Sequence, residues 1–589
     1  MRKLLVKFLF WRIKHVSDRN FIILLAALVG TLSGLAAVIL KQVVHIIHNF
    51  LISGFSYDFS NYLYFLYPLI GILLTVTISK YLLKESMGHG ITEILYDISK
   101  RFGRIKLSKT FSRLLTSGFT VGFGGSVGLE APIVVTGSAI GSNIGQFVHL
   151  NYKQKTILIG SGAAGAIAGI FNSPVAGVIF AIEIMLADIT VAMFIPLLIA
   201  AVFGSLISIL LIGEDVLFAF ELTDSFSTGD IPFYVLLGLL TGLFSVYFTR
   251  TTYRIEAAIK KINSDYMRAL VGGLSLGFVI FIFPPIYGEG YQTIKSLLNG
   301  ESLQVLENSL FFSQFENTAF IVLFLVGVVL IKPVASAITI GAGGSGGIFA
   351  PSLFSGGIIG FIFAISTNVF LGTDLSVVNF VLVGMSGAMS GILHAPLTAI
   401  FLIAEITSGY TLFIPLMLVS AISFNAASYF EKYSLYTKHL IERGDLIQND
   451  KDRQVLSQIN LKKIIETDLH IISPDAKLGD LVELVRKSHR NIFPVVSDNG
   501  DFIGVITLDD IREIMFDREM QENVEVNSLM NRAPAKVSPH ENMQSIMEKF
   551  ERTGAWNLPV VEDGKYLGFL SKSRIFNSYR KKLIRQQKQ

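Results

Sequence analysis

A glycine-rich stretch occurs twice in the apolar part of this chain, at a fixed separation. The first copy, Gly124–Pro132, reads GGSVGLEAP, and the second, Gly343–Pro351, reads GGSGGIFAP. Pro351 follows Pro132 by 219 residues (351 − 132 = 219), and Phe349 stands where the first copy has Glu130. A repeated motif in the same setting predicts that this part of the chain is duplicated.

A second pair of motifs supports the duplication. Pro174 and Glu183 in the first half correspond, in the same order, to Pro396 and Glu405 in the second half. In membrane proteins such repeats place the ion site where broken helices of the two halves meet near the midplane. An odd number of crossings between the repeats would invert one relative to the other, so inverted repeats are the expectation.

The composition indicates that most of the chain lies in lipid. Of its 589 residues, 51% are hydrophobic and 16% are charged, and the mean hydropathy is +0.57. The 52 glycines suit closely packed and broken helices. The absence of cysteine excludes disulfides and thiolate metal sites. No metal-ligand cluster, nucleophile elbow or phosphate loop is recognisable, so we expect neither a metal site nor an enzyme.

The sequence divides into three parts. Residues 1–19 predict a basic amphipathic helix on the cytoplasmic face, with a disordered tail as the alternative. Residues 20–445 predict an all-α polytopic membrane domain of broken and tilted helices, with repeats at about 20–215 and 230–440. Basic residues cluster between Lys100 and Arg113, which places that loop in the cytoplasm by the positive-inside rule.

Residues 446–589 are charged and predict a soluble α/β domain made of two similar units. These span about 460–517 and 525–585, and each reads as helix, strand, hairpin turn, strand and helix. The strands are nearly continuous apolar runs, so we expect them to be buried. The two units should pack together as one cytoplasmic domain.

Glu130 is the candidate functional residue of the first glycine-rich motif. An ionisable group at membrane depth is costly and marks a site that faces water, an ion or a partner. The glycines let backbone N–H groups approach an anion, and the helix that follows adds the positive end of its dipole. The plainer alternative is a tight turn with a surface glutamate.

These motifs resemble the ClC family of chloride channels and proton-coupled anion transporters, and the C-terminal part resembles a pair of CBS domains. The ordered set comprises Gly88–Glu93 (GHGITE), Gly128–Pro132 (GLEAP), Gly347–Pro351 (GIFAP) and Tyr436. The resemblance implies a homodimer in which each subunit has its own pathway for chloride or another small anion. We expect it in a bilayer, the inner (plasma) membrane of a bacterium, with both termini cytoplasmic and no nucleic-acid partner.

The resemblance also implies roles for single residues. Glu130 matches the family's gating glutamate, whose carboxylate occupies an anion site and leaves it when protonated or displaced. The implied anion-binding positions are His89, Gly90, Ile91, Gly128, Ile348, Phe349 and Tyr436. His89 stands where many members have serine, which leaves fluoride or nitrate specialisation open. Leu129 replaces a usual basic residue.

Ile184 is the departure with the most mechanistic weight. Proton-coupled relatives carry a second carboxylate at this position as an internal proton relay, and an isoleucine cannot carry a proton. The adjacent Glu183 points about 100° away on a helix and is expected to have a structural role shared with Glu405. We therefore expect a passive channel, with a proton-coupled antiporter as the alternative. A CBS-linked divalent cation transporter is a distant alternative, because it would need several convergent carboxylates.

CBS pairs resemble sensors of adenine nucleotides. Thr507 and Asp510 fit the family's contacts to phosphate and ribose, and Ser571 is the corresponding hydroxyl of the second unit, where Arg574 replaces the acidic partner. One site for ATP, ADP or AMP is the expectation, with a ligand-free dimerisation module as the alternative. No cofactor is expected to be required.

Overall fold

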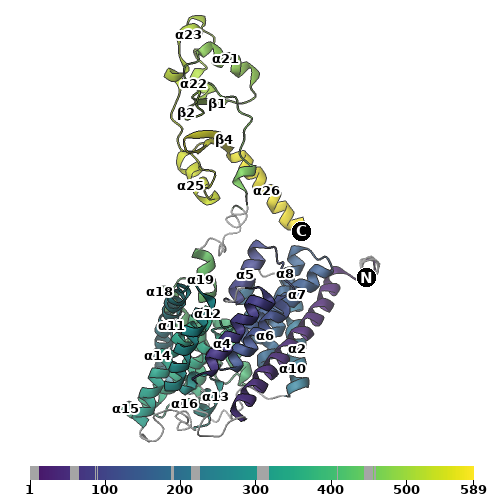
Figure 1. The fold of residues 1–589 in the computed structure, drawn as a ribbon, viewed down its shortest axis with the longest axis vertical. Helices are drawn as coiled ribbons and strands as arrows, with labels where there is room; N and C mark the ends of the chain where they lie inside the picture. Colours follow the sequence, from purple (N-terminus) through teal and green to yellow (C-terminus); the bar gives the residue numbers. More distant parts are fainter. Residues whose placement is uncertain are drawn as a thin grey trace. The chain divides into compact units, whose positions relative to one another are not determined.

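The computed structural model describes residues 12, 14–53, 65–85, 88, 90–186, 191–213, 226–300, 318–407, 409–442, 456 and 459–588. Most of the expected N-terminal helix (residues 1–19) lies outside these ranges. His89 also lies outside them. The chain forms two compact units, Met1–Leu446 and Ile447–Gln589, which are described separately (Figure 1).

The first unit is helical, and among the described residues seven helices are long and apolar enough to cross a membrane. The first repeat contains α2 (Asp18–Ser53), α4 (Tyr67–Thr77), η1 (Ile78–Leu83), α5 (Gly90–Lys100), α6 (Lys109–Gly122), α7 (Glu130–Phe147), α8 (Tyr152–Phe171), α9 (Pro174–Phe180), η2 (Ala181–Met185) and α10 (Val191–Ile212). Asn151 begins α8 with a capping box to Gln154, whereas α9 begins at a proline whose missing N–H costs nothing there.

The second repeat follows the same plan. It contains η3 (Thr228–Asp230), α11 (Ile231–Lys260), α12 (Asp265–Ile282), η4 (Pro284–Ile286), α13 (Tyr291–Leu298), α14 (Thr318–Gly341), α15 (Phe349–Leu371), α16 (Val377–Leu393), α17 (Pro396–Ile406), α18 (Phe413–Phe430) and α19 (Leu435–Glu442). Helices α7, α8 and α9 correspond to α15, α16 and α17. In both repeats a non-glycine residue in the left-handed region, Asn172 or His394, ends the second helix of the three.

Glycines set how closely the corresponding helices cross. A Cβ added at Gly137 in α7 would lie 2.2 Å from the carbonyl oxygen of Gly162 in α8. In the other repeat, a Cβ at Gly356 in α15 would lie 2.3 Å from the carbonyl oxygen of Gly384 in α16. Each pair of helices therefore packs backbone to backbone, as small residues allow in membranes. The same crossing at matching positions confirms the duplication.

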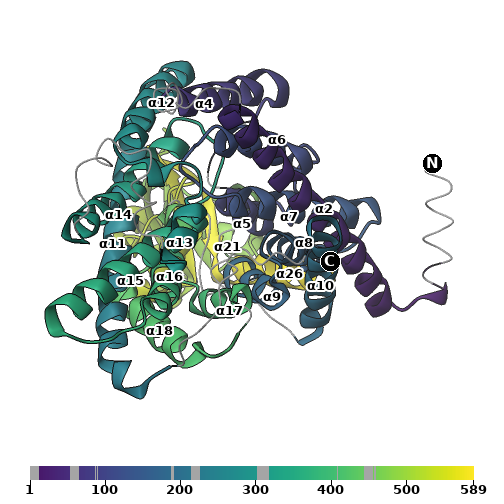
Figure 2. The same cartoon turned by 90° about the horizontal axis from the view of Figure 1, so that it is seen from below.

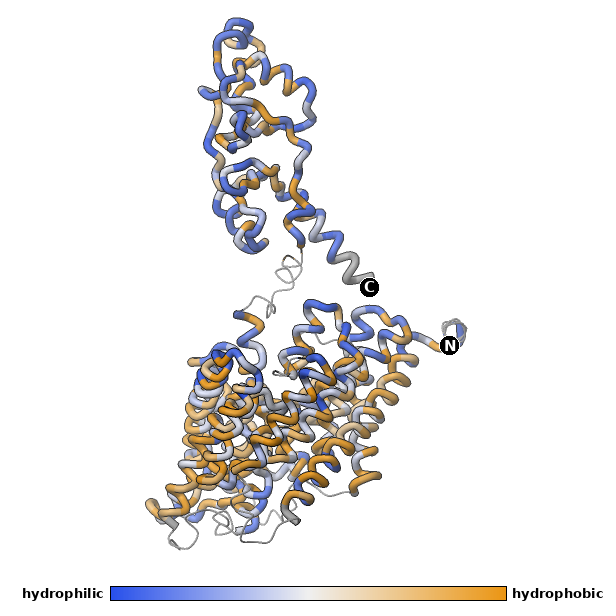
Figure 3. The backbone as a smooth tube through the Cα atoms, viewed as in Figure 1, coloured by the Kyte–Doolittle hydropathy of each residue, from blue (hydrophilic) through white to orange (hydrophobic). Residues whose placement is uncertain are grey.

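The two repeats interlock. Helix α4 of the first repeat packs against α12 of the second, and α9 packs against α17 (Figure 2). Hydrophobic residues predominate along the helices of the first unit (Figure 3), and many apolar side chains on the long helices are exposed. Leu210 is 75% exposed and Phe370 84% exposed. Such surface is stable only in contact with apolar lipid chains or another protein.

The second unit contains two β-hairpins, and the predicted order of elements is confirmed. Its elements are η6 (Leu461–Lys463), α21 (Leu478–Lys487), β1 (Ile492–Val496), β2 (Phe502–Thr507), α22 (Leu508–Ile511), α23 (Arg518–Asn523), α24 (Val526–Leu529), α25 (Met543–Thr553), β3 (Asn557–Glu562), β4 (Lys565–Ser571) and α26 (Lys572–Lys588). Strand β1 pairs antiparallel with β2, and β3 pairs antiparallel with β4. The strands are largely buried, as their apolar runs predicted.

The two hairpin units exchange edge contacts. Glu466 of the first CBS unit forms a bridge with Phe569 of β4 in the second, and Asn531 of the second CBS unit forms a bridge with Val505 of β2 in the first. Each hairpin therefore pairs with a segment of the other CBS unit. This exchange ties the two units into one domain, as expected from the sequence.

Candidate anion-binding site

The two glycine-rich motifs meet inside the first unit. Gly128 and Gly347 exchange both backbone hydrogen bonds, with N···O distances of 2.8 and 2.9 Å, and run antiparallel. Helix α7 begins two residues later at Glu130, and α15 begins two residues later at Phe349. A reciprocal exchange between equivalent residues requires a local two-fold axis, as expected for inverted repeats. It brings the starts of two helices to one place.

Side chains repeat this exchange next to the bridge. The hydroxyl of Thr339 accepts a hydrogen bond from the N–H of Ser126 at 3.2 Å. The hydroxyl of Thr120 accepts the equivalent bond from the N–H of Ser345 at 3.0 Å. Each motif is thus held by a threonine from the helix that precedes the other motif. The relative position of the two helix starts is therefore fixed by both repeats.

Neither helix start is capped by a side chain. The N-cap residues are Leu129 for α7 and Ile348 for α15, and an aliphatic side chain has no acceptor to offer. The first N–H groups of a helix have no partner within the helix, and they form the positive end of its dipole. Two such ends facing one buried place can hold a small anion.

The Glu130 carboxylate occupies this place. The residue is 1% exposed, and its Oε1 accepts a hydrogen bond of 2.7 Å from the hydroxyl of Tyr291. Its Oε2 lies over Gly128, where an added Cβ would be only 2.0 Å away. No described residue donates a well-formed hydrogen bond to Oε2, although the amides of Glu130 and Ala350 favour its charge. The carboxylate therefore stands where the helix starts would attract an anion.

Phe349 and Tyr436 are both buried in the first unit. The Phe349 ring is fully buried and stacks on Phe171, with centroids 5.5 Å apart. The Tyr436 side chain is 1% exposed, and its hydroxyl has no hydrogen-bond partner among the described residues. A buried hydroxyl without a partner is costly unless a ligand satisfies it. The Tyr436 hydroxyl is therefore a candidate donor to a bound ligand.

Helix α5 completes the site from another direction. Gly90 begins α5, and a Cβ added there would lie 2.5 Å from Val135 of α7. The hydroxyl of Thr92 in α5 donates to the backbone carbonyl of Tyr436 at 2.9 Å. Gly90, Ile91, Gly128, Glu130, Ile348, Phe349 and Tyr436 thus come from segments that converge, whereas His89 lies outside the described residues.

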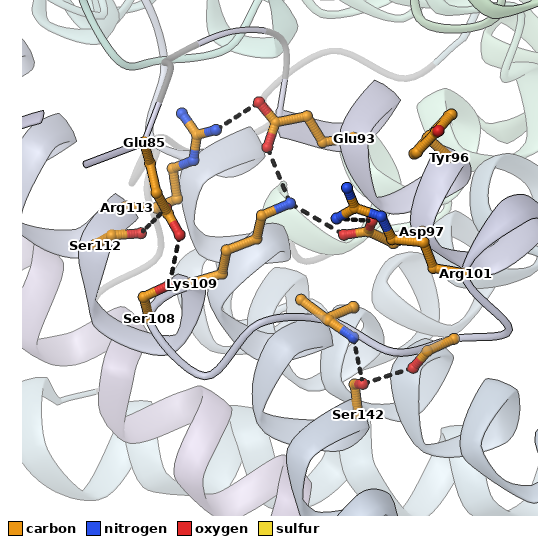
Figure 4. Close-up of polar contacts among 12 residues, drawn as sticks. Glu85, Glu93, Tyr96, Asp97, Arg101, Ser108, Lys109, Ser112, Arg113 and Ser142 are labelled. Atoms are coloured by element: carbon orange, nitrogen blue, oxygen red, sulfur yellow. Dashed lines mark hydrogen bonds and ion pairs between the residues drawn. The ribbon is translucent and has the colours of Figure 1, made fainter. Parts of the chain in front are cut away.

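A network of ion pairs fixes α5 against α6 (Figure 4). Lys109 pairs with Glu93 at 3.1 Å and with Asp97 at 3.0 Å, and Arg113 pairs with Glu93 at 2.7 Å. Arg113 and Asp97 are almost fully buried, so each needs the opposite charges around it. Arg101 also pairs with Asp97, and separate hydrogen bonds join Glu85 to Ser108 and Ser112. The network holds the start of α5 in position.

Ile184 lies in η2, a short π-helix that continues α9, and is partly buried. Glu183 next to it accepts hydrogen bonds from the N–H groups of Leu397 and Thr398, at 3.1 and 2.8 Å, and from the Thr398 hydroxyl at 2.7 Å. These groups are the start of α17, so Glu183 caps that helix. Its contacts are those of the structural role expected from the sequence.

Glu289 and Lys332 contact the first glycine-rich motif at the candidate site, and sequence reasoning missed both. Glu289 lies between η4 and α13, and its Oε1 accepts a hydrogen bond of 3.2 Å from the N–H of Leu129. Lys332 in α14 is fully buried, and its ammonium donates to Ser126 Oγ and to the carbonyls of Ile286 and Gly288. The sequence signal that could have identified them is a charged residue within apolar sequence. In addition, Glu289 stands between two glycines.

The candidate nucleotide-binding residues lie in the second unit. The hydroxyl and N–H of Thr507 both donate to Asp510 Oδ2, at 2.6 and 2.7 Å, and Asn531 donates to Oδ1 at 3.0 Å. The Ser571 hydroxyl donates to Glu466 at 2.5 Å. Thr507 and Asp510 therefore lie together at the start of α22, but Ser571 lies at the other hairpin and is bound to a carboxylate.

The fold and the site define a class: a membrane protein of two inverted repeats whose broken helices meet at a place suited to a small anion. Residues 70–428 match the family described as voltage gated chloride channel, and residues 461–517 and 526–581 match CBS domains. The chain belongs to the voltage-gated chloride channel (CLC) family and carries two CBS domains.

Curated relatives agree with this family. The chain is 27% identical over 461 residues to the H(+)/Cl(-) exchange transporter ClcA of Vibrio vulnificus, which covers 75% of this chain and 93% of the relative. It is 28% identical over 428 residues to chloride channel protein CLC-e of Arabidopsis thaliana, covering 67% of this chain but only 58% of that relative. It is 24% identical to CLC-f of the same plant over 93% of this chain and 78% of the relative.

Two solved structures share the fold. A slow cyanobacterial Cl−/H+ antiporter matches with a TM-score of 0.63 at 21% identity, covering 74% of this chain and all (100%) of that one. A eukaryotic CLC transporter matches with a TM-score of 0.62 at 19% identity, covering 95% of this chain and 99% of that one.

Proposed function

We propose that this protein conducts chloride or another small anion across a membrane, with Glu130 as the gate. The observation that carries the proposal is the position of the Glu130 carboxylate between two uncapped helix starts. An ionised carboxylate there competes with the anion for the same N–H groups. Protonation removes the competing charge, so acid opens the pathway. Tyr436 supplies a further donor to the anion.

The conduction is proposed to be passive. Ile184 offers no proton-binding group, and the oxygens of Glu183 are already engaged by the start of α17. A proton-coupled antiporter is the second candidate, supported by the similarity to the Vibrio H(+)/Cl(-) exchange transporter and to the cyanobacterial Cl−/H+ antiporter. The two candidates differ in whether chloride movement drives protons uphill.

Flux from liposomes tests both candidates. Purified protein in chloride-loaded liposomes is given a potassium ionophore, and chloride release and external pH are recorded together. A channel releases chloride without uphill proton movement, whereas an antiporter drives protons against their gradient. Uphill proton movement in the wild type would overturn the channel and leave the antiporter.

Two variants make the result specific. Glu130→Gln is expected to remove the pH dependence of flux, and persistent pH gating in this variant would overturn Glu130 as the gate. Ile184→Glu restores a carboxylate at the relay position and is expected to add proton movement to chloride flux. If wild type and Ile184→Glu both move protons equally, the identity of residue 184 does not decide the mechanism.

The resemblance further supports a homodimer with cytoplasmic termini. The chain has no cysteine, so single cysteines can be introduced without background labelling. A cysteine at Ser573 in the soluble unit is expected to react with a membrane-impermeant reagent only in inside-out vesicles. Labelling in right-side-out vesicles would overturn this orientation. Chemical crosslinking in the membrane is expected to give a dimer.

We also propose that the CBS pair binds one adenine nucleotide at Thr507 and Asp510. The hydroxyl and the carboxylate lie together in the turn that begins α22, so the hydroxyl can donate to a phosphate and the carboxylate can accept from ribose hydroxyls. A ribose would replace Asn531 at Asp510 Oδ1. Calorimetry with ATP, ADP and AMP is expected to show binding that Thr507→Val and Asp510→Asn weaken and Ser571→Ala leaves unchanged. No heat from any nucleotide would favour a purely structural module.

A further inference from the structure

The turn that carries Glu289 contacts the gate from two sides. Gly288 and Gly290 have φ values of 59° and 87°, so the chain reverses tightly around Glu289. Glu289 accepts the N–H of Leu129, the residue before the gate. Tyr291, two residues on, donates its hydroxyl to Glu130 Oε1 at 2.7 Å. One short turn therefore controls both the backbone and the carboxylate of the gate.

Glu289 is surrounded by charges of both signs and is not held by a single ion pair among the described residues. Its carboxylate is repelled by Glu130 of α7 and attracted by Lys41 of α2 and Lys332 of α14. The Lys332 ammonium gives its hydrogen bonds to Ser126 Oγ and two carbonyls and forms no ion pair with Glu289. Tyr291 of α13 also faces this place, and His48 of α2 lies against Tyr287, with ring centroids 5.8 Å apart.

Two carboxylates in one buried place repel each other, so one of them tends to keep a proton. Such a pair titrates as a unit, and the proton belongs to the pair rather than to either residue. Glu130 Oε2 is buried without a hydrogen-bond partner among the described residues, which is where a proton on that carboxyl can reside. Each group's charge therefore sets how readily the other binds a proton.

We propose that Glu289 is a second proton-binding residue of the gate, which shares one proton with Glu130 and tunes the pH at which Glu130 leaves the anion site. The inference rests on the proposed gating role of Glu130. When Glu289 is ionised, it favours the protonated form of Glu130 and so favours the open pathway. When Glu289 holds the proton, Glu130 is charged and occupies the anion site.

The direct test is the pH profile of chloride flux in Glu289→Gln. Glutamine keeps an oxygen that can accept the Leu129 N–H but cannot be charged. Without the repulsion, Glu130 ionises more easily, so the midpoint for opening is expected to move to lower pH by about one unit or more. The maximal flux at low pH is expected to be kept. An unchanged midpoint in a folded variant would overturn the proposal.

Further variants separate this inference from the gating role itself. Glu289→Asp keeps a titratable group and is expected to retain a midpoint closer to that of the wild type. Asp374→Asn, an exposed carboxylate elsewhere in the same unit, is the control and should not move it. If Glu130→Gln stays pH-gated, the gating role fails; if Glu130→Gln is flat but Glu289→Gln keeps the wild-type midpoint, only the shared proton fails.

A spectroscopic measurement gives a readout that does not depend on flux. The infrared C=O band of a protonated carboxylic acid is recorded while chloride is added at constant pH. Chloride displaces the Glu130 carboxylate, and the proton is expected to redistribute within the pair, which changes the band in the wild type. The change is expected to be lost in Glu289→Gln. A wild-type response in that variant would overturn the proposal.

Discussion

Glu183 and Glu405 cap each other's helices. Glu183, at the end of the first repeat's short helix, accepts the N–H groups that begin α17, the helix that carries Glu405. Glu405 accepts the N–H groups of Val175 and Ala176, which begin α9, at 3.0 and 2.8 Å. The two halves are thus joined by a reciprocal pair of charged caps.

Removing either cap should destabilise the protein to a similar extent. Glu183→Ala and Glu405→Ala each leave helix N–H groups without an acceptor, and each is expected to lower the free energy of unfolding by about 1–2 kcal/mol. The measurement is a denaturing-detergent titration, with the exposed Asp374→Ala as control. A Glu183→Ala variant of normal stability that loses proton movement would instead identify Glu183 as a proton carrier.

A methyl group at Gly128 should displace the gate. The added Cβ in Gly128→Ala would lie 2.0 Å from Glu130 Oε2 and 2.8 Å from the Cβ of Ala350, so the carboxylate must move. Flux at neutral pH is expected to rise toward that of Glu130→Ala, with a weaker pH dependence. Gly229→Ala, whose added Cβ meets only Ser227 Oγ at 3.5 Å, is the matched control. A wild-type pH profile would show that Oε2 lies elsewhere.

Loss of the Tyr436 hydroxyl should weaken anion binding. A hydrogen bond to a charged group contributes about 1.5–3 kcal/mol, so Tyr436→Phe is expected to raise the dissociation constant for chloride about tenfold or more. Calorimetric titration with chloride measures it. Tyr429→Phe, a tyrosine that is 84% exposed on α18, should leave the affinity unchanged. Equal affinity in Tyr436→Phe and wild type would remove this hydroxyl from the site.

Acid should weaken an ion pair within the first CBS unit. Arg490 bonds to Asp468, and this contact holds the pKa of that carboxyl below its usual value. A lowered pKa contributes stability above the ordinary pKa of about 4, and the contribution is lost as the pH falls through the lower, folded value. Because Asp468 is 67% exposed, the expected loss is only a few tenths of a kcal/mol.

Fluorescence of Trp556 in a Trp11→Phe background follows unfolding of the CBS pair, Ile447–Gln589. The pH dependence of the unfolding midpoint should be smaller in Asp468→Asn than in the wild type. It should persist in Asp498→Asn, the exposed control. The same acid sensitivity in both variants would show that another carboxylate is responsible.

Local patterns predicted much of this architecture. The duplicated motif predicted that broken helices of the two halves meet, and Gly128 and Gly347 of the two copies form a bridge there. The apolar runs around Gly500 identified the first hairpin, because a hairpin is set by residues close in sequence. Glu289 was missed, because it reaches Leu129 across 160 residues and no repeat partner marks it. Burial of Lys332 likewise depends on a turn far from it in sequence.

Glu130 and Phe349 hold the same place in two copies of one turn, and their backbones share the Gly128–Gly347 bridge. After duplication, the side chains at this place were free to diverge, one into a group that changes charge and one into an inert ring. The main chain is shared, because each glycine donates one hydrogen bond of the bridge and accepts the other. One paired main-chain arrangement therefore carries two side chains of opposite chemical character, of which only one can change its charge.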